Sequence, residues 1–228
     1  MINFLIAAAV ATAPAAACPA VVTPEALVCR ALQAKAAGDP AAAAQGFEEA
    51  AQAAQDKDPA KARMWAAAGN LWLAANQPGK AAAALDRALA LTGLEAEQRG
   101  EALLDRARAA EATNDLRTAR AKANDAAASI SDDPFYWYFS AALAIREQDA
   151  ATAQSAIGKA LALAPTDPAI LFEAGHVAHF AGDDDRARGY WMRAAGADPT
   201  GPVGKAAAKA VEILGVTPVV KTETQPPK

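Results

Sequence analysis

The residues of this chain best suited to holding a metal ion are two histidines in its C-terminal third. His176 and His179 are its only histidines, and three aspartates follow at positions 183–185. Histidines three positions apart on a helix share one face, so their imidazoles could bind a metal ion together with an acidic third ligand. Aspartates at those positions equally suit the free amides at the start of a following helix. We therefore expect no metal or other cofactor and interpret the histidines as a surface or groove-facing pair, with a metal or small-ligand site as the alternative.

Motifs of common enzyme chemistry are absent from the sequence. It contains no G-x-x-x-x-G-K-[ST], G-x-G-x-x-G, H-E-x-x-H or G-x-S-x-G pattern. The stretch "PGKA" at residues 78–81 lacks the upstream glycine and the hydroxyl residue of a phosphate loop, so we interpret it as a turn between paired helices. We expect a protein that is not an enzyme.

The first segment, "MINFLIAAAVATAPAAAC", is typical of an export signal. An apolar run over residues 2–10 precedes small residues suited to cleavage, although no Lys or Arg occurs before Arg30. The run is shorter than the roughly 20 apolar residues that span a bilayer, and no other segment approaches that length. We predict a signal peptide over residues 1–17 and a mature chain in the bacterial periplasm or at the cell envelope, without a membrane-spanning segment.

The two cysteines, Cys18 and Cys29, leave three alternatives open. An even cysteine count in an oxidising compartment favours a disulfide, which would close a short loop. Cleavage after residue 17 would make Cys18 the first mature residue, which resembles the lipid-attachment box of bacterial lipoproteins, although Ala15 stands where such a box usually has Leu, Val or Ile. Two plain thiols are the third alternative. A catalytic cysteine is disfavoured because neither residue stands in a recognisable relation to a histidine.

Composition favours an all-α protein. Ala supplies 69 of the 228 residues, and 53% of the chain is hydrophobic. Alanine has the highest helix propensity and lets helices approach closely, while the alternating β-branched and aromatic runs of strands are missing between Pro24 and Leu214. The net charge of −4 without a basic block argues against a nucleic-acid partner.

Large residues and turn residues recur along the chain at regular spacing. In the best example, Trp65, Gly69 and Trp72 lie on one helix, a turn follows at residues 76–79, and Leu85 lies on the next helix. Five such units begin 38, 38, 34 and 34 residues apart. We place them at residues 24–61, 62–99, 100–133, 134–167 and 168–201.

This pattern resembles the tetratricopeptide repeat, a 34-residue pair of antiparallel helices. The resemblance implies a right-handed α-solenoid, with longer connections near residues 55–59 and 93–98 where the spacing is 38. Asp-Pro pairs occur at residues 39–40, 58–59, 133–134, 167–168 and 198–199. Each pair is a candidate helix start, because aspartate accepts hydrogen bonds from free amides and proline suits the first helical position.

The ends of the repeat region are also predicted. Residues 18–23 form a linker, and residues 202–214 form a helix that covers the last unit with Val203, Ala207, Ala210, Val211 and Leu214. Gly215 would end this helix, and residues 215–228 would be a disordered tail.

In the repeat family the first helix of each unit lines a concave groove that holds protein or peptide partners. Successive residues of a helix are 100° apart around its axis. The side chains opposite the face that packs in the core can therefore be identified, and they should face this groove. The selected candidates are Asn70, Arg108, Phe135, Tyr138, Ile145, Arg146, Phe172, His176, His179 and Phe180.

Two details refine this prediction. The family's carboxylate clamp is disfavoured because Glu101 and Asp105 occupy positions that would supply cations. Within the aromatic run "FYWYF", Trp137 is assigned to packing, while Tyr136 and Phe139 are expected to contact a neighbouring repeat. The resemblance therefore implies an interaction scaffold in an envelope complex, with aromatic and histidine side chains at one end of the groove.

Overall fold

A computed structural model describes residues 17–216, which form eleven helices and no strand. None of these helices is long and apolar enough to cross a bilayer. The all-α fold predicted from the sequence is therefore confirmed. The helices are α1 (Pro24–Ala36), α2 (Pro40–Ala53), α3 (Ala60–Ala74), α4 (Pro78–Ala90), α5 (Ala96–Ala112), α6 (Leu116–Ile130), α7 (Pro134–Arg146), α8 (Ala150–Leu163), α9 (Pro168–Phe180), α10 (Asp184–Ala197) and α11 (Pro202–Val216).

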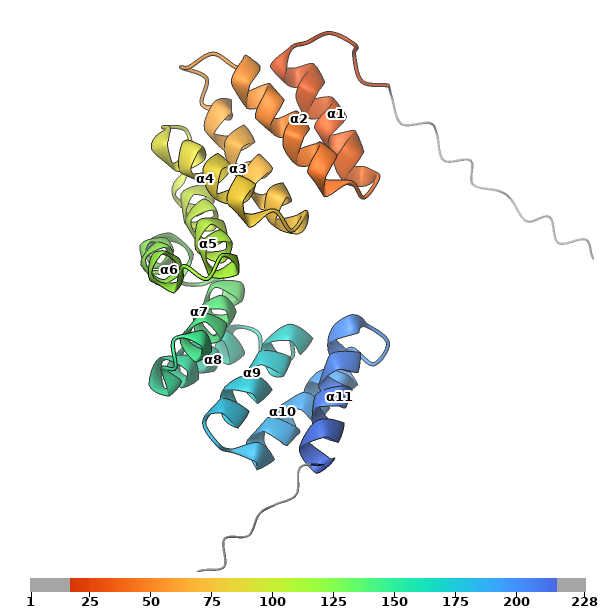
Figure 1. Ribbon diagram of the computed structural model, residues 1–228, viewed down its shortest axis with the longest axis vertical. Coiled ribbons are helices and arrows are strands. Elements are labelled where there is room, and N and C mark those ends of the chain that lie inside the picture. The colour runs from red at the N-terminus through yellow and green to blue at the C-terminus, as the bar shows by residue number, and fades with distance from the viewer. Residues whose placement is uncertain (1–16, 217–228) are drawn as a thin grey trace, which may run out of the picture.

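The first ten helices form five antiparallel pairs that stack into a curved, right-handed solenoid (Figure 1). Each helix packs against the next along the chain, and in two places the first helices of successive pairs also meet: α3 meets α5, and α7 meets α9. The eleventh helix packs on α10 and α9 and buries Ala207 and Leu214. It therefore caps the last pair with the face predicted from the sequence.

The turn within each pair contains one residue in the left-handed conformation. These residues have φ between 55° and 80° and recur at intervals of 38, 38, 34 and 34 residues; they are Gly38, Asn76, Asn114, Gln148 and Gly182. Glycine and asparagine adopt this conformation readily, whereas Gln148 is an uncommon choice. The backbone thus repeats with the same period as the sequence units.

Most second helices, and several first helices, begin at an aspartate whose carboxylate accepts a hydrogen bond from a first-turn amide. These aspartates are Asp39, Asp115, Asp133, Asp149, Asp167 and Asp183. The prediction for Asp198-Pro199 is wrong, because Asp198 ends α10 and α11 begins at Pro202. The Asp58 carboxylate accepts from the amide of Ala60, where α3 begins, one residue beyond the predicted start.

Two helix boundaries differ from those expected. The fifth helix begins at Ala96, inside the predicted connection at residues 93–98, because the Glu95 amide donates to the Gln98 side chain and starts the helix early. The last helix continues through Gly215 to Val216 instead of ending at Leu214.

The core is built from small residues facing large ones. Gly69 on α3 lies beneath Leu85 of α4, and Gly175 on α9 lies beneath the indole of Trp191 on α10. The Trp191 Nε1 also donates to the carbonyl oxygen of Phe172 at 3.0 Å. A glycine at these crossings allows the paired helices to close up, so the same packing solution appears in the second and fifth pairs.

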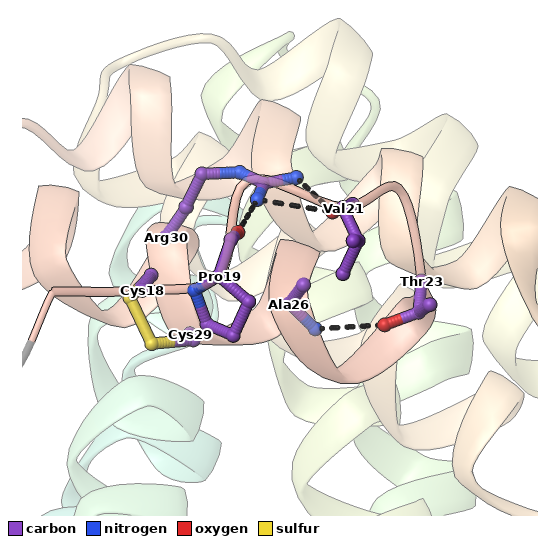
Figure 2. Close-up of a disulfide and its surroundings, with 7 residues drawn as sticks. All are labelled: Cys18, Pro19, Val21, Thr23, Ala26, Cys29 and Arg30. Atoms are coloured by element: carbon purple, nitrogen blue, oxygen red, sulfur yellow. Dashed lines mark hydrogen bonds between the residues drawn. A yellow bond between two sulfur atoms is a disulfide. The ribbon is translucent and has the colours of Figure 1, made fainter.

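The predicted linker at residues 18–23 is tied to α1 (Figure 2). Cys18 and Cys29 form a disulfide, and the Arg30 guanidinium donates to the carbonyl oxygens of Pro19 and Val21. A sulfur in a disulfide is not free to carry a lipid, so the structure favours the disulfide among the three alternatives. The predicted signal peptide, apart from Ala17, and the tail from residue 217 lie outside the described residues.

The glycine at the α9–α10 crossing provides a stability test. A Gly175→Ala methyl group would collide with the Trp191 indole, so we expect a loss of about 1–3 kcal/mol in the free energy of unfolding. Gly189→Ala on α10 is the matched control, because nothing lies within 4 Å of its added Cβ, and it should gain roughly 0.5–1 kcal/mol. Urea unfolding measures both, and equal stabilities of the two variants would contradict this packing.

Reduction of the disulfide should loosen one end of the solenoid. Closing a short loop with a disulfide is worth about 3 kcal/mol, and repeat arrays open locally. Reduction by dithiothreitol should therefore speed amide hydrogen exchange in α1 by up to about 100-fold. Exchange in α9–α11, at the other end of the solenoid, should stay unchanged. A Cys18→Ser variant should exchange quickly with or without reductant. Unchanged exchange in α1 on reduction would show that the disulfide does not hold this end.

Candidate binding groove

Five of the predicted groove residues line two adjoining hollows. The first has a volume of about 520 Å³ and lies among α3, α5 and the start of α7. We call it the acidic hollow; its charged and amide side chains are Arg63, Asn70, Gln98, Glu101, Asp105, Arg108 and Asp133. The second, the aromatic hollow, has a volume of about 390 Å³, and its larger side chains include Leu73, Glu111, Tyr138, Phe139, Leu143 and Arg146. Arg108 and Phe135 belong to both.

Asp105 organises the acidic hollow. Its carboxylate accepts a hydrogen bond from Asn70 Nδ2 at 2.7 Å and pairs with the Arg108 guanidinium at 2.7 Å. Asn70 lies on α3 and the other two on α5, so these bonds link two repeats. The Asp105 side chain is only 14% exposed, and water competes weakly for its partners. The Arg108 side chain is thereby held at the junction of the two hollows.

Phe135 and Tyr138 form the aromatic wall. Asp133 starts α7 by accepting the Phe135 amide at 2.8 Å, which places Phe135 in the first turn. The rings of Phe135 and Tyr138 stack with their centroids 5.5 Å apart, and the Arg108 guanidinium lies 5.4 Å from the Phe135 ring centroid. Phe135 remains 40% exposed, whereas Tyr138 is half-buried. Burial, with the nearby Glu173 charge, raises the pKa of the Tyr138 hydroxyl.

Arg146 lines the aromatic hollow, but its guanidinium is already bound. It donates to the carbonyl oxygen of Glu111 at 2.9 Å and to Asn114 Oδ1 at 2.7 Å, and it pairs with the Glu111 carboxylate. Both partners lie at the end of the preceding first helix. Arg146 therefore joins the third and fourth repeats as well as facing the groove.

The other members of the aromatic run are placed mainly by packing. Tyr136 and Phe139 are buried in the core that joins the third and fourth repeats, as expected for contacts with a neighbour. Trp137 is only half-buried; its indole donates to the Ser131 carbonyl oxygen, and the Lys159 ammonium lies 3.8 Å from its ring centroid. It is therefore less enclosed than Trp65, which it was predicted to match. Ile145 packs on the core between the fourth and fifth repeats and lines neither hollow.

The predicted residues on α9 form a separate cluster. Phe172 contacts His176 edge to face with a centroid distance of 4.5 Å, and both His176 and His179 pack near the Trp191 ring. Burial, with the nearby His179, lowers the pKa of His176. These three residues and the half-buried Phe180 line neither the acidic nor the aromatic hollow. The aromatic end predicted for the groove is thus split into two places.

The histidine cluster does not form a metal-ligand set. His179 Nδ1 lies 2.6 Å from Asp184 Oδ1, so part of the expected arrangement is present. However, residues 17–216 contain no group of three or more His, Cys, Asp or Glu side chains placed to hold a metal ion. No observation here favours the metal or small-ligand alternative over packing on Trp191.

Sequence reasoning missed Glu173. It lies on α9 one position after Phe172, at the edge of the face that the 100° rule selects, and it contributes to the electrostatic environment of Tyr138 on α7. Burial raises the pKa of the Glu173 carboxyl to about 7. A partly buried glutamate beside aromatic positions of the preceding repeat could have been suspected from its helical position, but the extent of its burial depends on the stacking of α7 and α9.

The fold is that of tetratricopeptide-repeat proteins, as comparison with solved structures shows. No protein-family model and no curated protein matches the sequence. Structural matches nevertheless cover most of the chain at 14–17% identity, and at this identity the likeness establishes the fold alone.

Three of these matches illustrate the likeness. YrrB, a repeat protein with an unusual peptide-binding site, has a TM-score of 0.58 at 15% identity, covering 81% of this chain and 91% of YrrB. PilW, a type IV pilus biogenesis factor, has a TM-score of 0.67 at 17% identity, covering 81% and 82%. A tetratricopeptide repeat protein from Parabacteroides merdae has a TM-score of 0.66 at 14% identity, covering 84% and 73%.

The partly buried Glu173 gives a pH prediction. Because the pKa of Glu173 is raised from 4.5 to about 7 on folding, ionisation opposes the fold, and the free energy of unfolding should fall as pH rises from about 4.5 to 7. Glu173→Gln removes this penalty, so it should be more stable than the parent by roughly 2–3 kcal/mol at pH 8, with little difference at pH 4.

Thermal unfolding at the two pH values measures this difference. Glu212→Gln, which removes an exposed carboxylate on α11, should show no comparable pH dependence. A Glu173→Gln effect of the same size at pH 4 and pH 8 would exclude ionisation as its cause.

Proposed function

We propose that this protein is a non-enzymatic interaction scaffold or adaptor that binds a peptide or protein segment in the groove formed by the acidic and aromatic hollows. The observation that carries the proposal is the position of Phe135, which stays 40% exposed where the two hollows meet. An aromatic ring on a recognition surface buries a large area on binding at little cost in rotamer entropy.

The surrounding contacts support this role because they hold the groove in shape before a partner arrives. Asn70 and Arg108 are fixed by Asp105, and Tyr138 stacks on Phe135. Side chains that are already ordered lose little further entropy on binding, so more of the contact energy appears as affinity. The likeness to YrrB, which has a peptide-binding site, is consistent with this proposal at the level of the fold.

We further propose that the scaffold works in a bacterial envelope complex. The predicted signal peptide over residues 1–17 supports export. The Cys18–Cys29 disulfide is compatible with the periplasm, where such bonds persist.

Site-specific photo-crosslinking of the full chain in cells tests the groove assignment. A benzophenone amino acid in place of Phe135 should capture a partner, while the same group in place of Met192, an exposed apolar side chain on α10 outside both hollows, should not. Phe135→Ala should weaken binding of the captured partner by about tenfold, and Met192→Ala should leave it unchanged. Equal capture at positions 135 and 192 would show that partners do not use this groove.

A further inference from the structure

The two hollows offer different chemistry to a bound segment. Three carboxylates line the acidic hollow: Glu101 and Asp105 from α5 and Asp133 from the start of α7. The aromatic hollow has apolar walls that include Leu73 and Leu143. A segment that crosses the junction at Phe135 would therefore meet acidic side chains on one side and apolar side chains on the other.

Of the two cations at the acidic hollow, Arg108 is held in an ion pair and Arg63 makes a long hydrogen bond. The Arg108 guanidinium is paired with Asp105, and the Arg63 guanidinium donates to the carbonyl oxygen of Gly93 at 3.4 Å. An acidic segment at the junction of the hollows would have to break the Arg108–Asp105 pair to bind Arg108. Removing one member of a partly buried pair leaves the other charge uncompensated, which makes this exchange costly.

The carboxylates, by contrast, are not fully compensated. Partial burial and the neighbouring charges of Glu97, Asp105 and Asp133 all raise the pKa of the Glu101 carboxyl. Asp133 is engaged in capping α7 and carries its charge toward the same hollow. The local field around Glu101 is therefore negative, and a cation placed there would relieve the repulsion among these groups.

The exposed ring beside these carboxylates suits the stem of a long basic side chain. Lysine and arginine lay their methylene chains along apolar surface while their charged ends reach polar groups. Phe135 is the ring shared by the two hollows and is 40% exposed, so such a stem can lie along the part of the side chain that Tyr138 and Arg108 leave uncovered. An apolar residue next to the basic one would then lie at the aromatic hollow.

We propose that the segment bound in the groove carries a lysine or arginine whose charged end enters the acidic hollow at Glu101 and Asp133, beside an apolar residue that enters the aromatic hollow. This inference rests on the proposed function and names the chemistry of its partner. The contact between the basic residue and the carboxylates is electrostatic. Salt screens such contacts, so the affinity should fall as ionic strength rises.

Selection from a random peptide library displayed on phage tests the inference against the full chain. We expect the selected peptides to be enriched in a Lys or Arg adjacent to an apolar residue, and to be lost when the target is the Phe135→Ala variant. Peptides that depend on Phe135 but lack a basic residue would overturn this inference and leave the proposed function standing. Failure to select any Phe135-dependent peptide would count against both.

Charge variants then locate the basic residue of a selected peptide, with fluorescence anisotropy as the readout. Glu101→Gln should weaken binding by roughly three- to fivefold, and Glu101→Lys by at least about tenfold. A peptide in which Glu replaces the basic residue should bind the Glu101→Lys variant more tightly than it binds the unsubstituted protein. Glu212→Gln, on the distant capping helix, should bind as the parent does. Undiminished binding of the basic peptide to Glu101→Lys would overturn the assignment.

Discussion

Close contact between a small residue on one helix and a large apolar side chain on its partner is the interaction on which the solenoid depends. Gly175 beneath Trp191 and Gly69 beneath Leu85 show the same arrangement in two different repeats. A single helix pair cannot bury its apolar face alone, so its stability comes from these crossings and from the next pair in the stack. Because the apolar faces at these crossings supply most of the packing, side chains on the concave face can serve recognition.

The joint between the third and fourth repeats uses charged side chains as well as apolar packing. The Arg120 guanidinium on α6 pairs with the Glu147 carboxylate at 2.6 Å and donates to the Ser140 hydroxyl, while Arg146 binds Glu111 and Asn114. At the same joint Arg108 lies over Phe135. Bulky side chains of α7 pack with α5 here, and the two hollows lie beside them. The groove and this joint are therefore parts of one arrangement.

Much of the fold could be predicted because the signals are local and repeated. The left-handed turn residues and the aspartate caps act within a few residues of themselves, and each recurs in several units, so their spacing shows the helix pairs. Asp198 shows the limit of such signals, since an aspartate before a proline can also end a helix. The site was harder to predict: Phe135, Tyr138 and Ile145 were all assigned to the groove face, yet Ile145 is covered by the next repeat.

By itself the sequence determined the number of helix pairs and their period, because helical periodicity and capping chemistry are properties of short segments. Only the tertiary structure decided which side chains of different repeats meet: Asn70 of α3 reaches Asp105 of α5, whereas the α9 histidines pack on Trp191. It also decided that Glu173 is partly buried, which raises the pKa of its carboxyl. These outcomes depend on the angle between successive repeats. That angle is set by the packing of many side chains together, so no short segment of the sequence determines it.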